Sequence, residues 1–283
     1  MLMAEVDKLL VNSYAGNYSK EVVEQLNLNL TYRVFEIFQV RTFCWLIEQA
    51  CNSCNDSDLP ITMVELGADT GHYSRIFHEL TNYFGKECLN VCTTILERQV
   101  HELIKYLPQE TTRVYHGYSG QFTGSEIDVD NTRQYSIEDL ITENSLNRID
   151  FLHVDIQGGE VDVIREIKDK NLFDKIRYYF ISTHNDVIPN AHLFVERILG
   201  EHARILVNET RHDNGWAHGD GFILAEDSRM GQTNIPEEYR NFAIQFNDAP
   251  AIVAFVENMA TSIDKAASSD IIARIQQRVG DRS

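Results

Sequence analysis

The chain has 283 residues, of which 43% are hydrophobic and 24% are charged. This is the composition of a globular protein with one large or two small domains, which excludes disordered and fibrous chains. With 25 basic and 43 acidic residues, the formal net charge is −18. A charge of this sign repels phosphate backbones and anionic headgroups, so we expect no nucleic-acid partner and no membrane partner.

The five cysteines follow no disulfide framework, which favours a reducing, cytoplasmic environment. Cys51 and Cys54 have the C-x-x-C spacing, but no second pair accompanies them, so we expect a structural or incidental role. Residues 1–13 lack the basic and apolar regions of a signal peptide, and no apolar run approaches the roughly 18 residues of a membrane helix.

The apolar pattern divides the chain into three parts. Residues 1–58 have helical periodicity and end in a polar stretch, which predicts a helical N-terminal extension that can act as a lid. Residues 59–228 alternate short apolar runs with helical ones. Residues 229–283 begin with turn residues and continue as a helical C-terminal extension, at 237–246, 249–267 and 270–279. The helical ends are also compatible with a homodimer.

The alternation in the central part is typical of βαβ units and predicts a mostly parallel sheet. We expect seven strands, at 61–67, 89–97, 112–117, 149–155, 176–183, 203–209 and 220–226. The expected helices lie between them, at 72–84, 100–106, 137–144, 160–168 and 191–199. The last two strands have no helix between them, so they are expected to form an antiparallel hairpin at a sheet edge, with six strands parallel and one reversed.

The first motif that indicates function is VELGADTGHYS at 64–74, which leads from a strand into a helix. Gly67 and Gly71 allow the backbone to turn tightly beside a ligand, and the helix N-terminus favours negative groups. Glu65 can accept a hydrogen bond from a ligand ammonium group. A dinucleotide fingerprint needs three glycines as GxGxxG, so NAD is disfavoured.

Two further acids follow expected strands. Glu97 comes at the end of the second strand, where an acid can hold both hydroxyls of a ribose; a solvated strand end is the alternative. Asp155 ends the strand of IDFLHVDIQGGEVDVIREI and precedes Gly158, Gly159 and a helix. We expect its carboxylate at the carboxyl edge of the sheet, although it could also serve as a helix cap.

These three motifs, in this order, resemble the FkbM-type S-adenosylmethionine-dependent methyltransferases over about residues 61–199. The resemblance implies a class I methyltransferase (Rossmann-like) α/β fold. The sequence departs from the family at Gln157, where an acid is commoner. The resemblance implies that S-adenosylmethionine is held at its methionine part by Glu65, Gly67 and Gly71, at its ribose by Glu97 and near its adenine by Tyr118 and Ser119. It places Asp155 near the methionine part or the reacting centre, and we assign Asp69 and Ser74 of the first motif to the cofactor as well.

The segment STHNDVIPN at 182–190 follows the next expected strand and brings His184, Asn185 and Asp186 toward Asp155. In a first reading, Asp155, His184 and Asp186 bind Mg²⁺ or a similar ion, as in catechol-type O-methyltransferases. In a second, His184 has a near-neutral pKa and removes the acceptor's proton without metal. In a third, the segment is only a turn.

The polar loop at 209–221 lies between the last two strands and contributes second-choice substrate or metal residues. They are His212, Asp213, His218 and Asp220, with Trp216 as a possible wall of the substrate site. A hydrated hairpin tip is the alternative.

The sequence thus favours transfer of a methyl group from S-adenosylmethionine to a hydroxyl of a small molecule, such as a sugar, a polyketide or another secondary metabolite. His184 and Asp155 are the candidate catalytic residues, with or without a divalent metal. The alternatives are methylation of nitrogen or carbon without metal, and a domain that binds the cofactor or a partner without catalysis.

Overall fold

The computed structural model describes residues 30–53, 59–120, 132–210 and 220–229, together with Thr233 and Ile235. The chain divides into two compact units, one formed by residues 43–235 and the other by residues 1–42 and 236–283. The expected C-terminal helices and most of the expected N-terminal extension lie outside the described residues. None of the described helices is long and apolar enough to cross a membrane.

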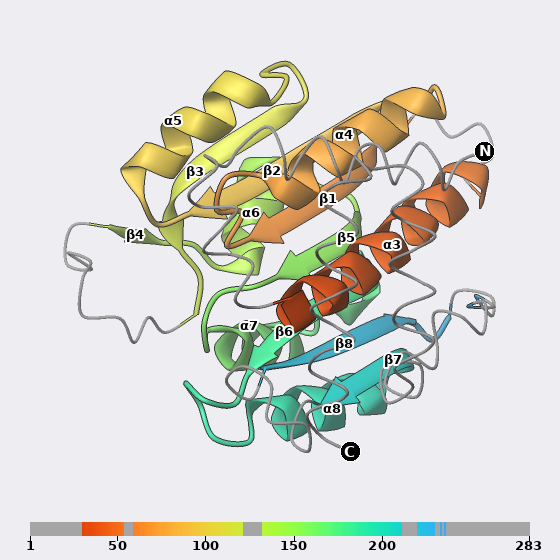
Figure 1. Cartoon of the computed structure of the whole chain (residues 1–283), viewed down its shortest axis with the longest axis vertical. Helices are drawn as coiled ribbons and strands as arrows, with labels where there is room; N and C mark the ends of the chain where they lie inside the picture. Colours follow the sequence, from red (N-terminus) through yellow and green to blue (C-terminus); the bar gives the residue numbers. More distant parts are fainter. Residues whose placement is uncertain are drawn as a thin grey trace. The chain divides into compact units, whose positions relative to one another are not determined.

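Strands and helices alternate along the described chain, as the apolar pattern predicts (Figure 1). The helices are α3 (Leu30–Ser53), α4 (His72–Tyr83), α5 (Glu97–Tyr106), α6 (Ile137–Glu143), α7 (Glu160–Asp169) and α8 (Ala191–His202), with a 3-10 turn at Phe173–Lys175. The strands are β1 (Ile61–Leu66), β2 (Cys88–Thr94), β3 (Thr112–Tyr118), β4 (Arg133–Gln134), β5 (Ile149–Val154), β6 (Ile176–His184), β7 (Ala203–Thr210) and β8 (Asp220–Asp227).

The described strands form one sheet in the order β4-β3-β2-β1-β5-β6-β8-β7. Only β8 runs antiparallel to its neighbours, β6 and β7, so the expected mostly parallel sheet and terminal hairpin are confirmed. The expected number of strands was wrong, because β4 adds an eighth. It has two residues, too few to produce an alternating apolar pattern.

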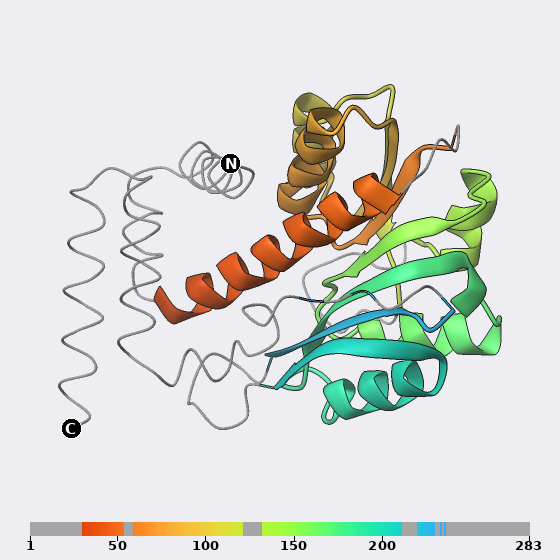
Figure 2. The same ribbon diagram turned by 90° about the vertical axis from the view of Figure 1, so that its right-hand side faces the viewer.

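Alternate residues of the central strands face two different layers. Leu152 and Val154 of β5 pack with apolar side chains of α6, α7 and α8. On the other face, Phe43 of α3 contacts Phe151 of β5 and also Tyr73 of α4, and Figures 1 and 2 show α4 lying across this face. Both faces of the sheet are therefore covered, which leaves the carboxyl edge of the parallel strands as the expected place for a ligand.

Candidate functional site

Five loops meet at the carboxyl edge, because β3, β2, β1, β5 and β6 are parallel neighbours that end at the same side. The loop after β1 turns through positive φ angles at Gly67 (80°), Asp69 (45°) and Gly71 (82°). A side chain at Gly67 would overlap the carbonyl oxygen of Asp155, which follows β5. The glycine is required here because the loops after β1 and β5 touch.

The same loop leads into α4, whose N-cap is Gly71. No side chain caps this end of the helix. The first backbone N–H groups of a helix carry a partial positive charge and suit a carboxylate or phosphate when no side chain occupies them. The two glycines allow close packing within the protein, because a side chain at Gly67 would meet Asp155 and one at Gly71 would meet Leu103. Approach of a ligand to this backbone stays a prediction.

Glu65 lies beneath this loop and is 1% exposed. Its carboxylate accepts a hydrogen bond from the Ser74 hydroxyl of α4 and faces Nδ1 of His153 of β5 at 3.2 Å. The Asn90 amide of β2 in turn donates to the Ser74 hydroxyl at 2.7 Å. Both carboxylate oxygens thus have partners within the protein, a network that the sequence analysis did not foresee.

Asp69, in the loop after β1, and Glu97, which follows β2, are both exposed. The expectation that Glu97 ends the second strand was wrong. β2 ends at Thr94, and Glu97 is the first residue of α5. The apolar residues Ile95 and Leu96 extend the strand-like pattern past the true strand end. Gln99 of α5 links the end of β2 to the loop after β1. Its amide oxygen accepts a hydrogen bond from Thr94 Oγ1 at 2.5 Å, and its amide nitrogen donates to Asp69.

The turn after β3 reaches toward the end of β5. A side chain at Gly120 would overlap the backbone of Gly159, so these two turns are in direct contact. Tyr118 ends β3 and is half-buried. Ser119 is buried, and its hydroxyl has no hydrogen-bond partner among the described residues, which leaves a donor available for a ligand.

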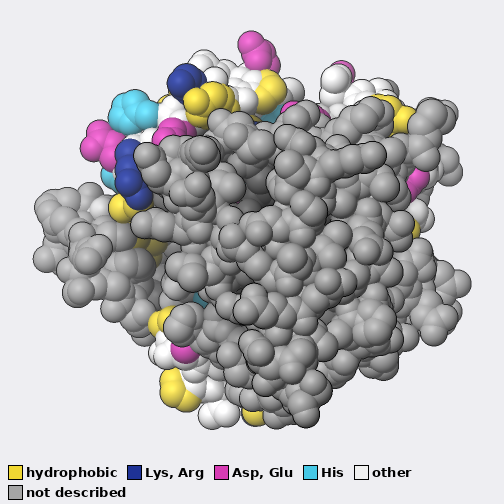
Figure 3. All heavy atoms as spheres, viewed as in Figure 1, with side chains coloured by type: hydrophobic (Ala, Val, Ile, Leu, Met, Phe, Trp, Pro, Cys, Tyr) yellow, Lys and Arg dark blue, Asp and Glu magenta, His cyan; other side chains and the backbone are white. Residues whose placement is uncertain are grey.

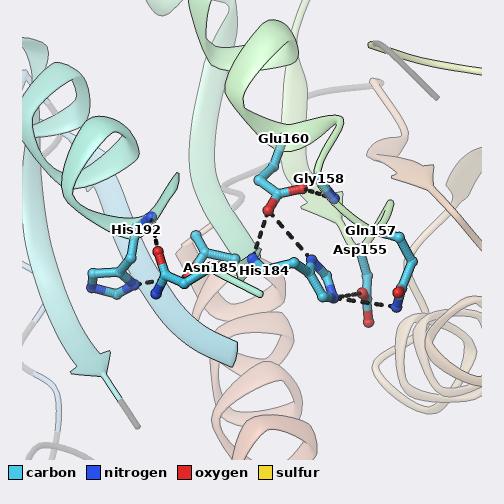
Figure 4. A network of polar contacts seen from close by, with 8 residues as sticks. Asp155, Gln157, Gly158, Glu160, His184, Asn185 and His192 are labelled. Carbon is cyan, nitrogen blue, oxygen red and sulfur yellow. Dashed lines mark hydrogen bonds and ion pairs between the residues drawn. The ribbon is translucent and has the colours of Figure 1, made fainter. Parts of the chain in front are cut away.

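The loop after β5 and the end of β6 form a network around His184 (Figure 4). Nε2 of the His184 ring lies 3.3 Å from Oδ1 of Asp155, and Nδ1 lies 3.3 Å from Oε1 of Glu160. The Glu160 side chain also accepts hydrogen bonds from the backbone N–H groups of Gly158 and His184, both at 2.7 Å. The structure thus brings together the two candidate catalytic residues, Asp155 and His184.

The charge of His184 differs from the expectation of a near-neutral base. Burial by itself lowers the pKa of the ring, but the hydrogen bonds and charges of Asp155 and Glu160 outweigh it and raise the pKa to about 10. The ring is therefore a cation at neutral pH and has no free lone pair to accept a proton. Asp155, whose side chain is 38% exposed, is the group of this pair that faces outward.

The three expected metal ligands do not converge. Asp186 is exposed on the turn after β6, while the ring nitrogens of His184 already face two carboxylates. Among the described residues, no group of three His, Cys, Asp or Glu side chains could hold a metal ion. Asn185 lies in the same turn, where its Oδ1 accepts a hydrogen bond from the backbone N–H of His192 at 3.0 Å and anchors the turn to α8.

Most of the remaining candidate residues, from the 209–221 loop and the C-x-x-C pair, lie outside the described part of the chain. His212, Asp213, Trp216 and His218 lie outside the described residues, as does Cys54. The backbone of Asp220 pairs with that of His184 across β8 and β6, which does bring this loop's end beside the network. Cys51 is a buried residue of α3.

Comparison with known proteins gives one family match. The family described as the methyltransferase FkbM domain matches residues 14–206. None of the curated proteins matches the chain.

Several solved methyltransferase structures are similar at low identity. TrmK of M. capricolum, in complex with S-adenosyl-homocysteine, is 12% identical with a TM-score of 0.38, over 81% of this chain and 93% of that one. A putative RNA methyltransferase from Pyrococcus horikoshii is 15% identical with a TM-score of 0.39, over 66% and 85%. The N-terminal domain of human METTL16, in complex with S-adenosyl-homocysteine, is 11% identical with a TM-score of 0.39, over 67% and 70%. Likenesses this distant carry no information about the methyl acceptor.

Proposed function

Because the chain belongs to the family of FkbM-type methyltransferases and has the class I α/β fold, we propose that it transfers a methyl group from S-adenosylmethionine to a hydroxyl oxygen of a small molecule. The observation that carries this proposal is the position of the Asp155–His184 pair. Asp155 directly follows β5, and its backbone touches the glycine turn after β1. A carboxylate that can accept a proton therefore lies beside the loop that we assign to the methyl donor.

The residues at the edge fit the donor in three respects. The uncapped start of α4 suits a carboxylate. The unpartnered Ser119 hydroxyl can bond a polar ring edge, with Tyr118 beside it. Glu65, held by Ser74, and Asp69 provide negative charge near a cationic amino-acid part, and Glu97 is assigned to the ribose. When bound, S-adenosylmethionine supplies a methyl group on a positively charged sulfur.

Asp155 is the residue that we assign to the acceptor. Its carboxylate accepts a hydrogen bond from the hydroxyl and takes the proton as the oxygen becomes methylated. His184 does not act as the base, because it is already protonated; it donates to Oδ1 of Asp155 and so orients the carboxylate. Most of the rate enhancement comes from aligning the oxygen with the methyl group.

We include neither a metal ion nor nucleic acid in this proposal. The expected ligands are not arranged for a divalent ion within the described part of the chain. The net charge of −18 opposes binding to a phosphate backbone. In the view of Figure 3, acidic, basic and histidine side chains are mixed over α5 at the upper left, so this part of the described surface has no single sign of charge.

Calorimetric titration with S-adenosylmethionine and S-adenosylhomocysteine, before and after treatment with a chelator, tests the proposal first. We expect micromolar binding that the chelator leaves unchanged. If neither ligand binds, the proposed methyltransferase function is wrong. If binding is lost after chelation and restored only by Mg²⁺, the result supports the metal hypothesis.

A screen of hydroxyl-bearing small molecules with methyl-labelled donor then tests the reaction. Asp155→Asn should reduce methyl transfer about 100-fold or more and leave binding of S-adenosylhomocysteine within about threefold, because proton transfer is lost but the glycine turn is kept. Lys168→Ala, on the exposed side of α7, is the matched control and should behave as wild type. Transfer to amines alone would favour the N-methyltransferase alternative.

A further inference from the structure

Glu160 is a fully buried carboxylate that the proposed reaction does not use directly. It is the first residue of α7, and its side chain is 0% exposed. Three donors surround it in Figure 4: the backbone N–H of Gly158, the backbone N–H of His184 and the ring nitrogen Nδ1 of His184.

The burial of the Glu160 carboxylate is unfavourable by itself, so its contacts have to account for it. Burying a carboxylate removes its hydration, which destabilises the fold unless hydrogen bonds and an opposite charge offset the loss. The two backbone donors would by themselves explain a glutamate that only ties Gly158, which has a φ of 102°, to the end of β6. They do not explain why Oε1 also faces the ring of His184 at 3.3 Å.

The contact with the ring determines where its other nitrogen points. With Nδ1 directed at Glu160, Nε2 is directed at Oδ1 of Asp155. The side-chain amide of Gln157 also lies beside Nε2, with its nitrogen at 3.4 Å, and next to a protonated ring it has to present its oxygen in place of this nitrogen, because two donors do not bond each other. A ring turned over would lose both carboxylates at once. The turn beyond His184 is held independently, by the hydrogen bond from the His192 backbone N–H to Asn185 Oδ1. The backbone at His184 is therefore anchored both by Glu160 and by the following turn.

We propose that Glu160 is a positioning residue for methyl transfer: it holds the ring and backbone of His184 so that Nε2 donates to Asp155. For the identity of the reaction this inference rests on the proposed function, but the contact itself can be tested without it. The charged groups that face the ring among the described residues are Asp155, from the loop after β5, and Glu160, from α7. With one carboxylate at each nitrogen, the ring is a double donor, which agrees with its raised pKa.

Glu160→Gln is the variant that separates positioning from simple scaffolding. The amide has nearly the same shape, but it has only one accepting oxygen and no charge, so it cannot serve the backbone of Gly158 and the ring of His184 together. Glu166→Gln is the matched control, because Glu166 is also on α7 and also accepts a backbone N–H, from Glu138, but it has no histidine partner.

The measurement is nitrogen NMR of histidine-labelled protein at pH 7.5 without ligand, with the His184 signals identified by their loss in His184→Gln. We expect two protonated ring nitrogens in wild type and in Glu166→Gln. In Glu160→Gln, a substantial fraction of the ring should be neutral. A neutral ring in wild type, or wild-type signals in folded Glu160→Gln, would overturn the proposal. If Glu160→Gln does not fold, Glu160→Asp replaces it, since its shorter side chain keeps the charge and withdraws from the ring.

Kinetics with an acceptor from the screen provide the second readout. Glu160→Gln should lower kcat about tenfold while the Kd of S-adenosylhomocysteine stays within twofold. An equal loss of cofactor affinity would instead indicate that Glu160 only supports the loop. If wild type binds no S-adenosylhomocysteine, the proposed function fails, whereas the NMR signals still decide whether Glu160 positions His184.

Discussion

Two buried histidines on neighbouring strands each face a glutamate, yet their surroundings differ. His153 of β5 has Glu65 on one side and the rings of Tyr73 and Phe180 around it, and its Nε2 has no hydrogen-bond partner among the described residues. His184 of β6 has a carboxylate at each nitrogen, one buried and one partly exposed. The two histidine–glutamate contacts therefore differ in how they continue: only the contact of His184 extends, through Asp155, to a partly exposed carboxylate at the sheet edge.

The largest effect on stability is expected at the buried contact between Glu65 and His153. Glu65→Ala removes the partner of both His153 and Ser74 and leaves a cavity beneath the glycine turn, so we expect a loss of about 3–5 kcal/mol in the free energy of unfolding. Urea unfolding followed by circular dichroism measures it. A loss below about 1 kcal/mol would mean that Glu65 is not part of the stabilising core.

Gly67 lies where the loop after β1, above Glu65, meets the loop after β5, which carries Asp155. In Gly67→Ala, the new methyl group meets the Asp155 carbonyl and the backbone is strained at a φ of 80°, so we expect a loss of about 2 kcal/mol or more. Affinity for S-adenosylhomocysteine should fall as well, because the turn has to move. Gly85→Ala is the control: it has a φ of 64° but nothing nearby, so it reports the backbone strain alone. Equal effects at the two glycines would argue against contact between the two loops.

The third effect is a dependence on pH. The pKa of His184 is raised to about 10 in the folded protein, from 6.5 when unperturbed, so the folded state holds this proton more tightly. Its contribution to stability is complete below pH 6.5 and is lost as the pH rises toward 10. The stability difference between wild type and His184→Gln should therefore shrink, by up to a few kcal/mol, across this interval. Parallel stability curves for the two proteins would show that His184 is not charged in the fold.

The smallest effect is expected on the surface. Lys168 of α7 and Glu201 of α8 form an ion pair at 3.0 Å, but both side chains are largely exposed. Because solvent and salt screen such pairs, Lys168→Ala should leave the unfolding midpoint unchanged. A clear decrease in the unfolding midpoint would show that an exposed ion pair also stabilises the fold. Burial would then not be what sets the contacts of Glu65 and Glu160 apart from surface pairs.

The sequence predicted the elements around the site well, because their signals are local. Apolar runs predicted strands at 61–67, 149–155 and 176–183, and β1, β5 and β6 end within one residue of these bounds, at Leu66, Val154 and His184. The polar residues that follow these runs marked the carboxyl edge. The same local reasoning extended β2 too far, to Glu97, since Ile95 and Leu96 continue the apolar run after the last paired residue.

What the sequence by itself determined is the α/β pattern, the glycine turn after the first strand and the presence of Asp155 and His184 near one edge. The protonation of His184 was decided only by the tertiary structure. Glu160 comes close to the ring through a turn with positive φ angles at Gln157 and Gly158 and through the pairing of β5 with β6. The pKa of a buried group depends on which charges lie within a few ångströms, and that distance follows from packing, which no spacing along the chain records.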